Sequence, residues 1–366
     1  MSTEKPFMFD VEERSLRTSL RSCRGQELAV DQQELALGPY ERKKRLRKKK
    51  RSREDKNLTD DERVTLQAEL EDLFQPREDP SDLPKDLQLV VEKQVHERPG
   101  ILKENIKILK ELIKQEENLN ARTDDLFLAA FLRGRKHDVE KAFRCVKNFY
   151  EFGNKYPDMY SLIYPSENPE VFDQQHFGSL PGTDRKGRKI CAIIPHRLRP
   201  SEIPLIQSFR MGRTVLEIML MDLRLQVMGT CVIFDMGGLS LVQQARLITP
   251  TVCWHLAMCV QDKIPMRLKA VHIVNQPSYF NAIHAIFKRL LKKKLRKRIF
   301  LHGTDYKSLH EHIAPEELPE EWGGTRKPFS GTLTKTLLHL NEDKFREWTD
   351  TKTTPFSEPV MEWKLF

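Results

Sequence analysis

The stretch from Pro277 to Ile299 constrains this chain more than any other, because it combines an apolar stripe with a dense run of cations. Its apolar residues recur at steps of three and four, a spacing that puts them on one face of a helix. They are Phe280, Ile283, Phe287, Leu290, Leu291, Leu295 and Ile299. The pattern predicts one amphipathic helix, which either covers an apolar core or lies against an anionic membrane surface.

The charge of the chain is concentrated in two places. Eight Lys or Arg residues and no acidic residue lie between positions 288 and 298, and residues 41–56 hold eleven basic residues against three acidic ones. The whole chain carries a net charge of only +9, so the remaining residues sum to −7. Two local basic patches on a mildly acidic body indicate docking surfaces rather than a general affinity for anions.

Length and composition bound the class of protein. At 366 residues, of which 39% are hydrophobic, the chain is long enough to bury one large core or two modest ones. No apolar run reaches the roughly 18 to 20 residues that span a bilayer, and the first ten residues lack the apolar segment of a signal peptide. None of the six cysteines forms a CxxC pair. We therefore expect an intracellular protein with reduced thiols in its core.

Composition and periodicity divide the chain into four parts. Residues 1–57 lack sustained periodicity and are expected to form a disordered basic tail. Residues 58–157 carry apolar residues at helical spacing, which predicts an N-terminal helical domain. Residues 158–330 alternate short β-rich runs with long helical ones, which predicts an α/β domain with a mainly parallel sheet and helical cover. Residues 331–366 look irregular and are expected to form a C-terminal tail.

Within the α/β part, four runs are predicted strands: KICAII, TCVIFD, KAVHIVN and RIFLHG. The segment GTDRKGRK at 182–189 has the glycine spacing of a phosphate-binding loop, but it ends in Arg-Lys where Lys-Ser or Lys-Thr is needed. It also lies between two strand-like runs. A hairpin turn with Gly187 at a positive φ is therefore the favoured interpretation.

No arrangement of residues indicates catalysis. Cys191 and Arg197 have the spacing of a phosphatase nucleophile and its phosphate-binding arginine, but the residues between them include no glycine and do include Pro195, which lacks an N–H group. His310 and His312 have no cysteine or carboxylate partners that resemble a metal site. A GxSxG nucleophile motif is also absent from the sequence. We therefore expect no catalytic residue, no metal and no cofactor.

The order of several motifs resembles the CRAL-TRIO (Sec14-like) lipid-transfer family, nearest to its α-tocopherol transfer and retinaldehyde-binding branch. The motifs are FLRGRKHDVEKAFRCVKNFYEF at 131–152, DRKGRKI at 184–190, VIFDMGGLSL at 232–241, ITP at 248–250, VHIVNQPSYFNAIHAIFK at 271–288, RIFLHG at 298–303 and LPEEWGG at 318–324. The resemblance implies an N-terminal helical bundle and an α/β domain whose sheet floors an apolar cavity. It also implies a mobile gate helix over that cavity, which falls on Pro277 to Ile299.

The resemblance further implies a site for a phosphoinositide head group. In the tocopherol-transfer branch, basic residues on the strand before the gate and at the end of the gate bind this group. By motif they fall on Arg267, Lys269, Lys294 and Arg298, and all four positions are basic here. Positions 294 and 298 are one helical turn apart, so both could contact one polyphosphate. The alternative is that these are four unrelated surface cations.

The ligand pocket of that branch falls on apolar residues of this chain. Five line the cavity and three face inward from the gate: Phe209, Leu256, Cys259, Val260 and Val271, then Phe280, Ile283 and Phe287. A core and a pocket share the same apolar chemistry, so all eight could equally be ordinary core residues.

Resemblance and charge distribution together predict a non-enzymatic carrier. Its ligand would be a hydrophobic small molecule such as a tocopherol or a retinoid, and its basic gate would dock on membranes that contain phosphatidylinositol bisphosphate. We expect a monomeric, cytoplasmic protein that associates reversibly with membranes and does not bind nucleic acid. The alternative is a lipid-sensing interaction protein whose run at 41–56 binds nucleic acid or a nuclear import receptor and so directs it to the nucleus.

Overall fold

The computed structural model describes residues 60–74, 77–247, 249, 252, 254–257, 261, 263–277, 280, 284, 285, 288, 289 and 291–350. The described residues from Thr65 onward belong to one compact unit, and the chain up to Val64 is assigned to another. The tail 1–57 with its basic run at 41–56 lies outside the described residues, and the expected boundaries at 57, 157 and 330 stay predictions. No helix of the described residues is both long and apolar enough to cross a membrane.

The first part of the described chain is helical, as predicted. It begins with α3 (Asp60–Leu73), α4 (Lys85–Gln88) and α5 (Val91–Val95). The next helices, α6 (Ile101–Gln115) and α8 (Val139–Lys155), each bury one apolar stripe against α7 (Asp125–Gly134). Asp124 and Asp138 begin α7 and α8 by accepting hydrogen bonds from backbone N–H groups of the first turn.

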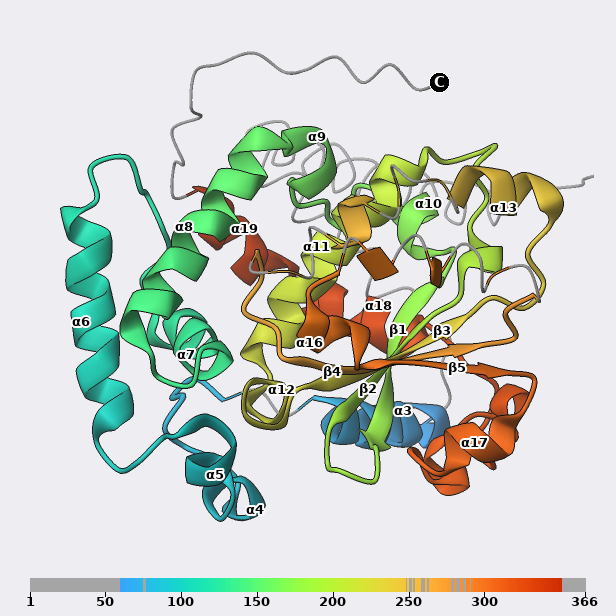
Figure 1. The fold of residues 1–366 in the computed structure, drawn as a ribbon, viewed down its shortest axis with the longest axis horizontal. Helices are drawn as coiled ribbons and strands as arrows, with labels where there is room; N and C mark the ends of the chain where they lie inside the picture. Colours follow the sequence, from blue (N-terminus) through green and yellow to red (C-terminus); the bar gives the residue numbers. More distant parts are fainter. Residues whose placement is uncertain are drawn as a thin grey trace, which may run out of the picture. The chain divides into compact units, whose positions relative to one another are not determined.

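A five-stranded sheet in the order β1-β2-β3-β4-β5 forms the second part of the fold (Figure 1). Its strands are β1 (Phe177–Thr183), β2 (Lys189–Ile193), β3 (Thr230–Asp235), β4 (Leu268–Val274) and β5 (Ile299–Gly303). The first two strands are antiparallel and β2 to β5 are parallel, so the mainly parallel α/β fold is confirmed. Gly187 has a φ of 71° in the turn between β1 and β2, which confirms the hairpin rather than a phosphate loop.

Helices cover both faces of this sheet. The helices before β1 are α9 (Pro157–Tyr160) and α10 (Pro169–Phe172), and α11 (Leu205–Met221), α12 (Leu223–Met228), α13 (Leu241–Leu247) and α17 (Tyr306–His310) come later. Short 3₁₀ turns lie at Pro195–Arg197, Pro315–Glu317 and Glu320–Trp322. Figure 1 shows α10 and α11 above the strands and α17 below them.

The segment Pro277 to Ile299 is not one helix, so that prediction is wrong. Residues 288 and 289 are helical, but Lys292 has extended backbone angles (φ −60°, ψ 148°) and α16 (Lys293–Arg296) begins after it. Ile299 opens strand β5 and pairs with Val271 of β4. The chain must leave its helical course before Ile299 to join the parallel sheet, and side-chain spacing alone does not reveal that pairing.

The expectation of irregular structure after residue 330 is wrong for the described residues 331–350. They form α18 (Thr332–Leu340) and α19 (Glu342–Asp350). Leu337, Leu338 and Phe345 join the same apolar cluster as α11. Each helix has only nine residues, and helices this short are stabilised by packing more than by their own sequence.

Candidate functional site

Two cross-strand rows of apolar side chains lie on one face of the sheet, named here the open face. The rows are Cys191, Val232, Val271 and Ile299, then Ile193, Phe234, Ile273 and Leu301. Cys191 and Ile273 are buried, whereas the other six are half-buried. Half-burial of Val232 and Phe234 is unexpected, because β3 is the middle strand of the sheet.

The residues that alternate with these rows point to the opposite side, named here the closed face. Six of them are at most 1% exposed: Ile190, Ala192, Cys231, Ile233, Ala270 and His272. Phe300, on the edge strand β5, is half-buried. Leu309 of α17, with Ile313, Leu318 and Trp322 after it, packs on this face. Both faces come from the same strands, so the difference in burial reflects what covers each face.

Two predicted pocket residues meet at the open face. Val271 lies in its first row, and Phe280, which is 9% exposed, packs beside it in the cluster with Met236 and Ile273. Phe209 lies elsewhere, at the edge of the cluster formed by α6, α7 and α8, with its ring centroid 6.2 Å from that of His255. Leu256 follows His255 and is 36% exposed.

Four other predicted pocket residues lie outside the described residues: Cys259, Val260, Ile283 and Phe287. The lining of the ligand pocket therefore stays a prediction. The sequence reading missed Val232, Phe234, Ile299 and Leu301 on the open face. The strand register could have identified them. Val271 pairs with Val232 and Ile299, so alternate residues of TCVIFD and RIFLHG lie on the same face as Val271.

The four predicted phosphoinositide residues come from three neighbouring segments and form what is named here the basic cluster. Arg267 precedes β4, Lys269 lies in β4, Lys294 lies in α16, and Arg298 immediately precedes β5. Arg267 donates hydrogen bonds to the carbonyl groups of Val227 and, at 2.8 Å, Gln94. Arg298 donates to the carbonyl of Leu268. These bonds fix two of the guanidinium groups against the backbone.

The basic cluster is an uncompensated concentration of positive charge. Burial, followed by the charges of Arg267 and Arg298, lowers the pKa of Lys269 to about 8, and burial beside Arg298 lowers the pKa of Arg267 to about 10. Burial and nearby cations also lower the pKa of Lys294. None of the four cluster residues forms an ion pair with a carboxylate of the described residues. Because these cations repel one another, a bound anion would stabilise their protonated forms.

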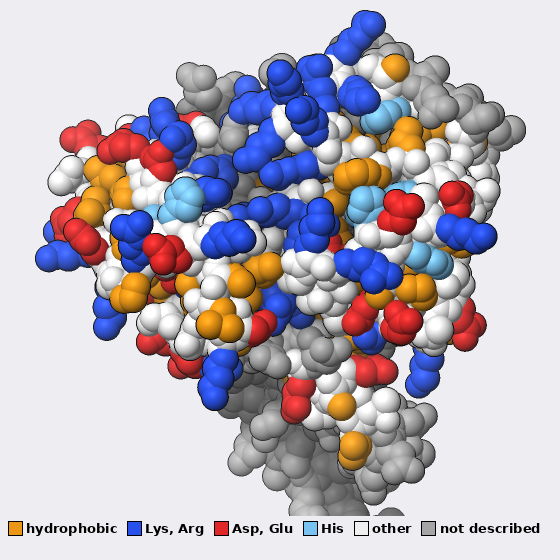
Figure 2. All heavy atoms as spheres, turned by 60° about the horizontal axis from the view of Figure 1, so that its bottom comes forward, with side chains coloured by type: hydrophobic (Ala, Val, Ile, Leu, Met, Phe, Trp, Pro, Cys, Tyr) orange, Lys and Arg blue, Asp and Glu red, His pale blue; other side chains and the backbone are white. Residues whose placement is uncertain are grey.

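Residues outside the prediction extend the cluster. Lys136 acts electrostatically on Lys269 and Lys294, and Arg135 acts on Lys294. Both lie in the turn after α7, where Gly134 faces the carbonyl oxygen of Pro265, 2.5 Å from where a Cβ atom would lie. A side chain at Gly134 would push the turn away from the segment that leads into β4. Figure 2 shows one face of the molecule, on which Lys and Arg side chains gather in the upper middle while Asp and Glu side chains lie mainly towards the edges.

The phosphatase-like pair is not a site. Cys191 is buried in the sheet, and burial raises the pKa of its thiol, which disfavours the reactive thiolate. Arg197 instead donates hydrogen bonds to the carbonyl groups of Gln175 (3.2 Å) and Phe329 (3.0 Å). Cys145, Cys191 and Cys231 are buried free thiols, as expected, while the other three cysteines lie outside the described residues.

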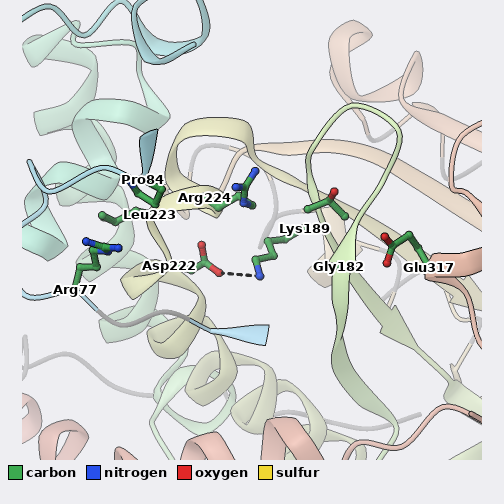
Figure 3. A pocket seen from close by; sticks show the side chains of 9 residues that line it. Arg77, Pro84, Gly182, Lys189, Asp222, Leu223, Arg224 and Glu317 are labelled. Atoms are coloured by element: carbon green, nitrogen blue, oxygen red, sulfur yellow. Dashed lines mark ion pairs between the residues drawn. The ribbon is translucent and has the colours of Figure 1, made fainter. Parts of the chain in front are cut away.

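A groove of about 280 Å³ near the β1-β2 turn is lined mainly by charged side chains (Figure 3). The Lys189 ammonium lies 3.7 Å from the Asp222 carboxylate, and it also donates to the carbonyl of Leu73. Arg77, Arg224 and Glu317 have ion-pair partners of their own in Asp82, Asp86 and Arg326. This groove does not suit an apolar ligand, and its charges are already compensated.

Comparison with known proteins shows which family this chain belongs to. The chain is 33% identical over 264 residues to "Alpha-tocopherol transfer protein-like" from Homo sapiens, which covers 72% of this chain and 77% of that protein. The chain belongs to the CRAL/TRIO family. The family's CRAL/TRIO domain matches residues 173–324, and a "Pinta-like, UBA domain" matches residues 99–172. The first of these matches contains the whole sheet, the open face and the basic cluster.

Other similar proteins span comparable lengths. Clavesin-2 from Homo sapiens is 33% identical over 273 residues, which cover 74% of this chain and 82% of that protein. The solved structure titled "Crystal structure of Sfh5" covers 72% of this chain and 98% of its own, with 15% identity and a TM-score of 0.40. A likeness of that size adds nothing to the fold described above. CRAL/TRIO relatives are lipid-binding and lipid-transfer proteins.

Proposed function

We propose that this CRAL/TRIO protein is a non-enzymatic carrier of an apolar small molecule. The ligand class is a tocopherol, a retinoid or a similar lipid, which the open face and Phe280 would contact. We further propose that the carrier docks on phosphoinositide-containing membranes through the basic cluster. The name of the relative "Alpha-tocopherol transfer protein-like" supports the ligand class.

The unequal burial of the two sheet faces is the observation that carries the proposal. Val232 and Phe234 lie in the middle strand and are half-buried, whereas Ile233 between them is fully buried. Apolar area left uncovered in the middle of a sheet costs about 25 cal/mol per Å². A lipid laid on these rows removes that cost. It also gains about 0.8 kcal/mol for each of its own buried CH₂ groups.

The basic cluster supports docking on an anionic surface. Lys or Arg residues near an anionic leaflet contribute about 1 kcal/mol each, and salt reduces this contribution. A head group that carries several phosphates fits better than one with a single phosphate, because the four cations lie in adjacent segments and have no carboxylate partners among the described residues.

Vesicle flotation tests the docking half of the proposal. The protein is mixed with phosphatidylcholine vesicles that either contain or lack phosphatidylinositol bisphosphate, and the floating fraction is measured. We expect flotation only with the phosphoinositide, and we expect Lys294→Glu to weaken it by about tenfold, because the change removes one positive charge and adds one negative charge.

Lys344→Glu is the matched control, because Lys344 is an exposed lysine of α19 and its reversal changes the net charge equally. It should float like the unmodified protein. Equal flotation with both kinds of vesicle, or equal weakening by the two reversals, would overturn docking through the basic cluster.

Native mass spectrometry tests the carrier half. Protein purified from its own cells is analysed intact, and the co-purifying molecule is then extracted with solvent and identified. We expect one apolar molecule per chain, chemically unchanged after transfer between vesicles. A chain that carries no apolar molecule and takes up none from vesicles would contradict the proposal.

A further inference from the structure

The helical residues 254–257 place two large apolar side chains at the surface. Trp254 is 37% exposed and Leu256 is 36% exposed. Most large hydrophobic side chains of the described residues are buried, and of the six that are exposed, two lie in this single turn. The indole N–H of Trp254 has no hydrogen-bond acceptor among the described residues. This turn therefore exposes apolar area together with a donor that has no acceptor in the described part of the chain.

The inner side of the same turn fixes its orientation. His255 is 4% exposed, and its ring centroid lies 6.2 Å from those of Phe209 and Tyr156. The Trp254 ring lies edge-on to His255 at 4.9 Å and to Tyr156 at 6.4 Å. Edge-to-face contacts of this kind hold aromatic rings in place. The tryptophan is thus held by two neighbouring rings and exposes 37% of its surface to solvent.

Two lysines belong to segments that adjoin this turn. The Lys155 ammonium lies 5.6 Å from the centroid of the Tyr156 ring. In addition, Gln261 donates a hydrogen bond to the carbonyl of Ala257 (3.0 Å) and accepts one from the backbone N–H of Lys292 (2.7 Å). Lys292 is the exposed N-terminal cap of α16, the helix that carries Lys294 of the basic cluster. One glutamine therefore joins the apolar turn to the segment of the basic cluster.

We propose that Trp254, with Leu256, is an anchor that inserts at the headgroup level of the bilayer on which the basic cluster docks. Tryptophan favours this depth because its ring is apolar while its N–H can bond to headgroups or water. Neighbouring lysines favour an anionic lipid surface over an uncharged protein partner. This inference rests on the proposed docking function and adds the residue that penetrates the membrane.

Quenching of tryptophan fluorescence by brominated lipids tests the inference. The full chain is bound to vesicles of phosphatidylcholine and phosphatidylinositol bisphosphate, with and without bromine on the acyl chains, and emission is compared. We expect quenching in the unmodified protein and its loss in Trp254→Phe. Trp322 contributes an unquenched background, because it is fully buried and its indole N–H donates to Asp235.

Two further variants serve as matched controls. Trp348→Phe replaces an indole ring whose centroid lies 3.6 Å from the guanidinium carbon of Arg122. Trp363→Phe replaces a tryptophan that lies outside the described residues. Both should keep the quenching. Unchanged quenching in Trp254→Phe, or its loss in Trp363→Phe instead, would overturn the anchor.

Flotation of the same variants separates this inference from the proposed docking. Trp254→Ala should bind phosphoinositide vesicles about tenfold more weakly, since insertion of one large apolar side chain is lost. If the unmodified protein floats but brominated lipids do not quench it, the anchor is wrong and docking stands. If it does not float on these vesicles, both proposals fail.

Discussion

The closed face of the sheet packs against α17 and Trp322, while the open face lies beside Phe280. Neighbouring residues of one strand therefore differ in burial. On β3, Ile233 is fully buried and the flanking Val232 and Phe234 are half-buried. The three side chains are all apolar, so their hydrophobicity does not explain the difference. The difference therefore reflects how closely other parts of the chain pack on each face: Ile233 belongs to the fully buried cluster with Leu309 and Trp322, whereas Val232 lies at the margin of the cluster that includes α11.

The largest expected effect tests whether the closed face carries the stability. Ile233→Ala should lower the free energy of unfolding by about 2 to 5 kcal/mol, because it leaves a cavity in a fully packed layer. Phe234→Ala removes more atoms but should cost less in the lipid-free protein, since its side chain is already half-buried. Denaturant unfolding of both variants measures this, and a larger loss for Phe234→Ala would break the comparison.

The second prediction concerns ligand affinity. Phe234→Ala should weaken binding of a fluorescent apolar ligand by about tenfold or more, through the loss of one large contact on the open face. Phe300→Ala is the matched control, because Phe300 is also half-buried but points to the closed face and stacks on His272. Titration of both lipid-free variants should show a change only for Phe234→Ala. Equal weakening would mean that the open face is not the contact surface.

Acidification should weaken the closed face. His272 and His302 lie on that face, 3.0 Å apart between ring nitrogens, and burial lowers the pKa of His272 to about 3 and that of His302 to about 4. The unfolded chain binds protons below about pH 6.5, whereas these folded imidazoles do not until about pH 4. This contribution to stability is therefore complete above pH 6.5 and is lost as the pH falls towards 4.

Unfolding by denaturant at pH 7 and pH 5 measures this effect. We expect a decrease of about 1 to 2 kcal/mol for each of the two imidazoles at pH 5. His272→Gln should reduce the pH dependence, while His96→Gln, at an exposed position, is the control that should leave it unchanged. A His272→Gln variant with the full pH dependence would show that the closed-face imidazoles are not responsible.

Adding one hydroxyl to each face tests how well each face excludes water. Val274→Thr should cost about 1 to 3 kcal/mol, because Val274 is fully buried on the closed face and the new hydroxyl gains no solvent. Val232→Thr on the open face should cost less than about 1 kcal/mol in the lipid-free protein, since its side chain is half-buried. Equal losses in thermal unfolding would show that the two faces are equally sealed.

Much of the sheet could be predicted from local sequence. Short runs rich in β-branched residues, such as TCVIFD, match β3 closely, and the hairpin followed from Gly187 between two such runs. The continuous helix to Ile299 was wrong, because periodicity records which residues are apolar and not which strand they pair with. The helices at 332–350 were missed, because tertiary packing stabilises them.

The candidate site was predictable only in part. Family motifs gave Val271, Phe280 and the four residues of the basic cluster, but not Lys136 or Phe234. Lys136 adjoins the cluster because Gly134 lets a turn approach Pro265, and Phe234 shares a face with Val271 because of the strand register. Contacts between residues far apart in the sequence, such as Gly134 and Pro265, are not encoded in local spacing.

Local sequence alone determined the positions of the four parallel strands, the family and the uneven placement of charge, since composition, spacing and motif order are properties of neighbouring residues. Tertiary structure decided that Lys269, Lys294 and Lys136 act on one another, and that the middle strand is sealed on one side and half-buried on the other. Electrostatic strength and burial depend on distances through space, and folding brings distant parts of the chain to those distances.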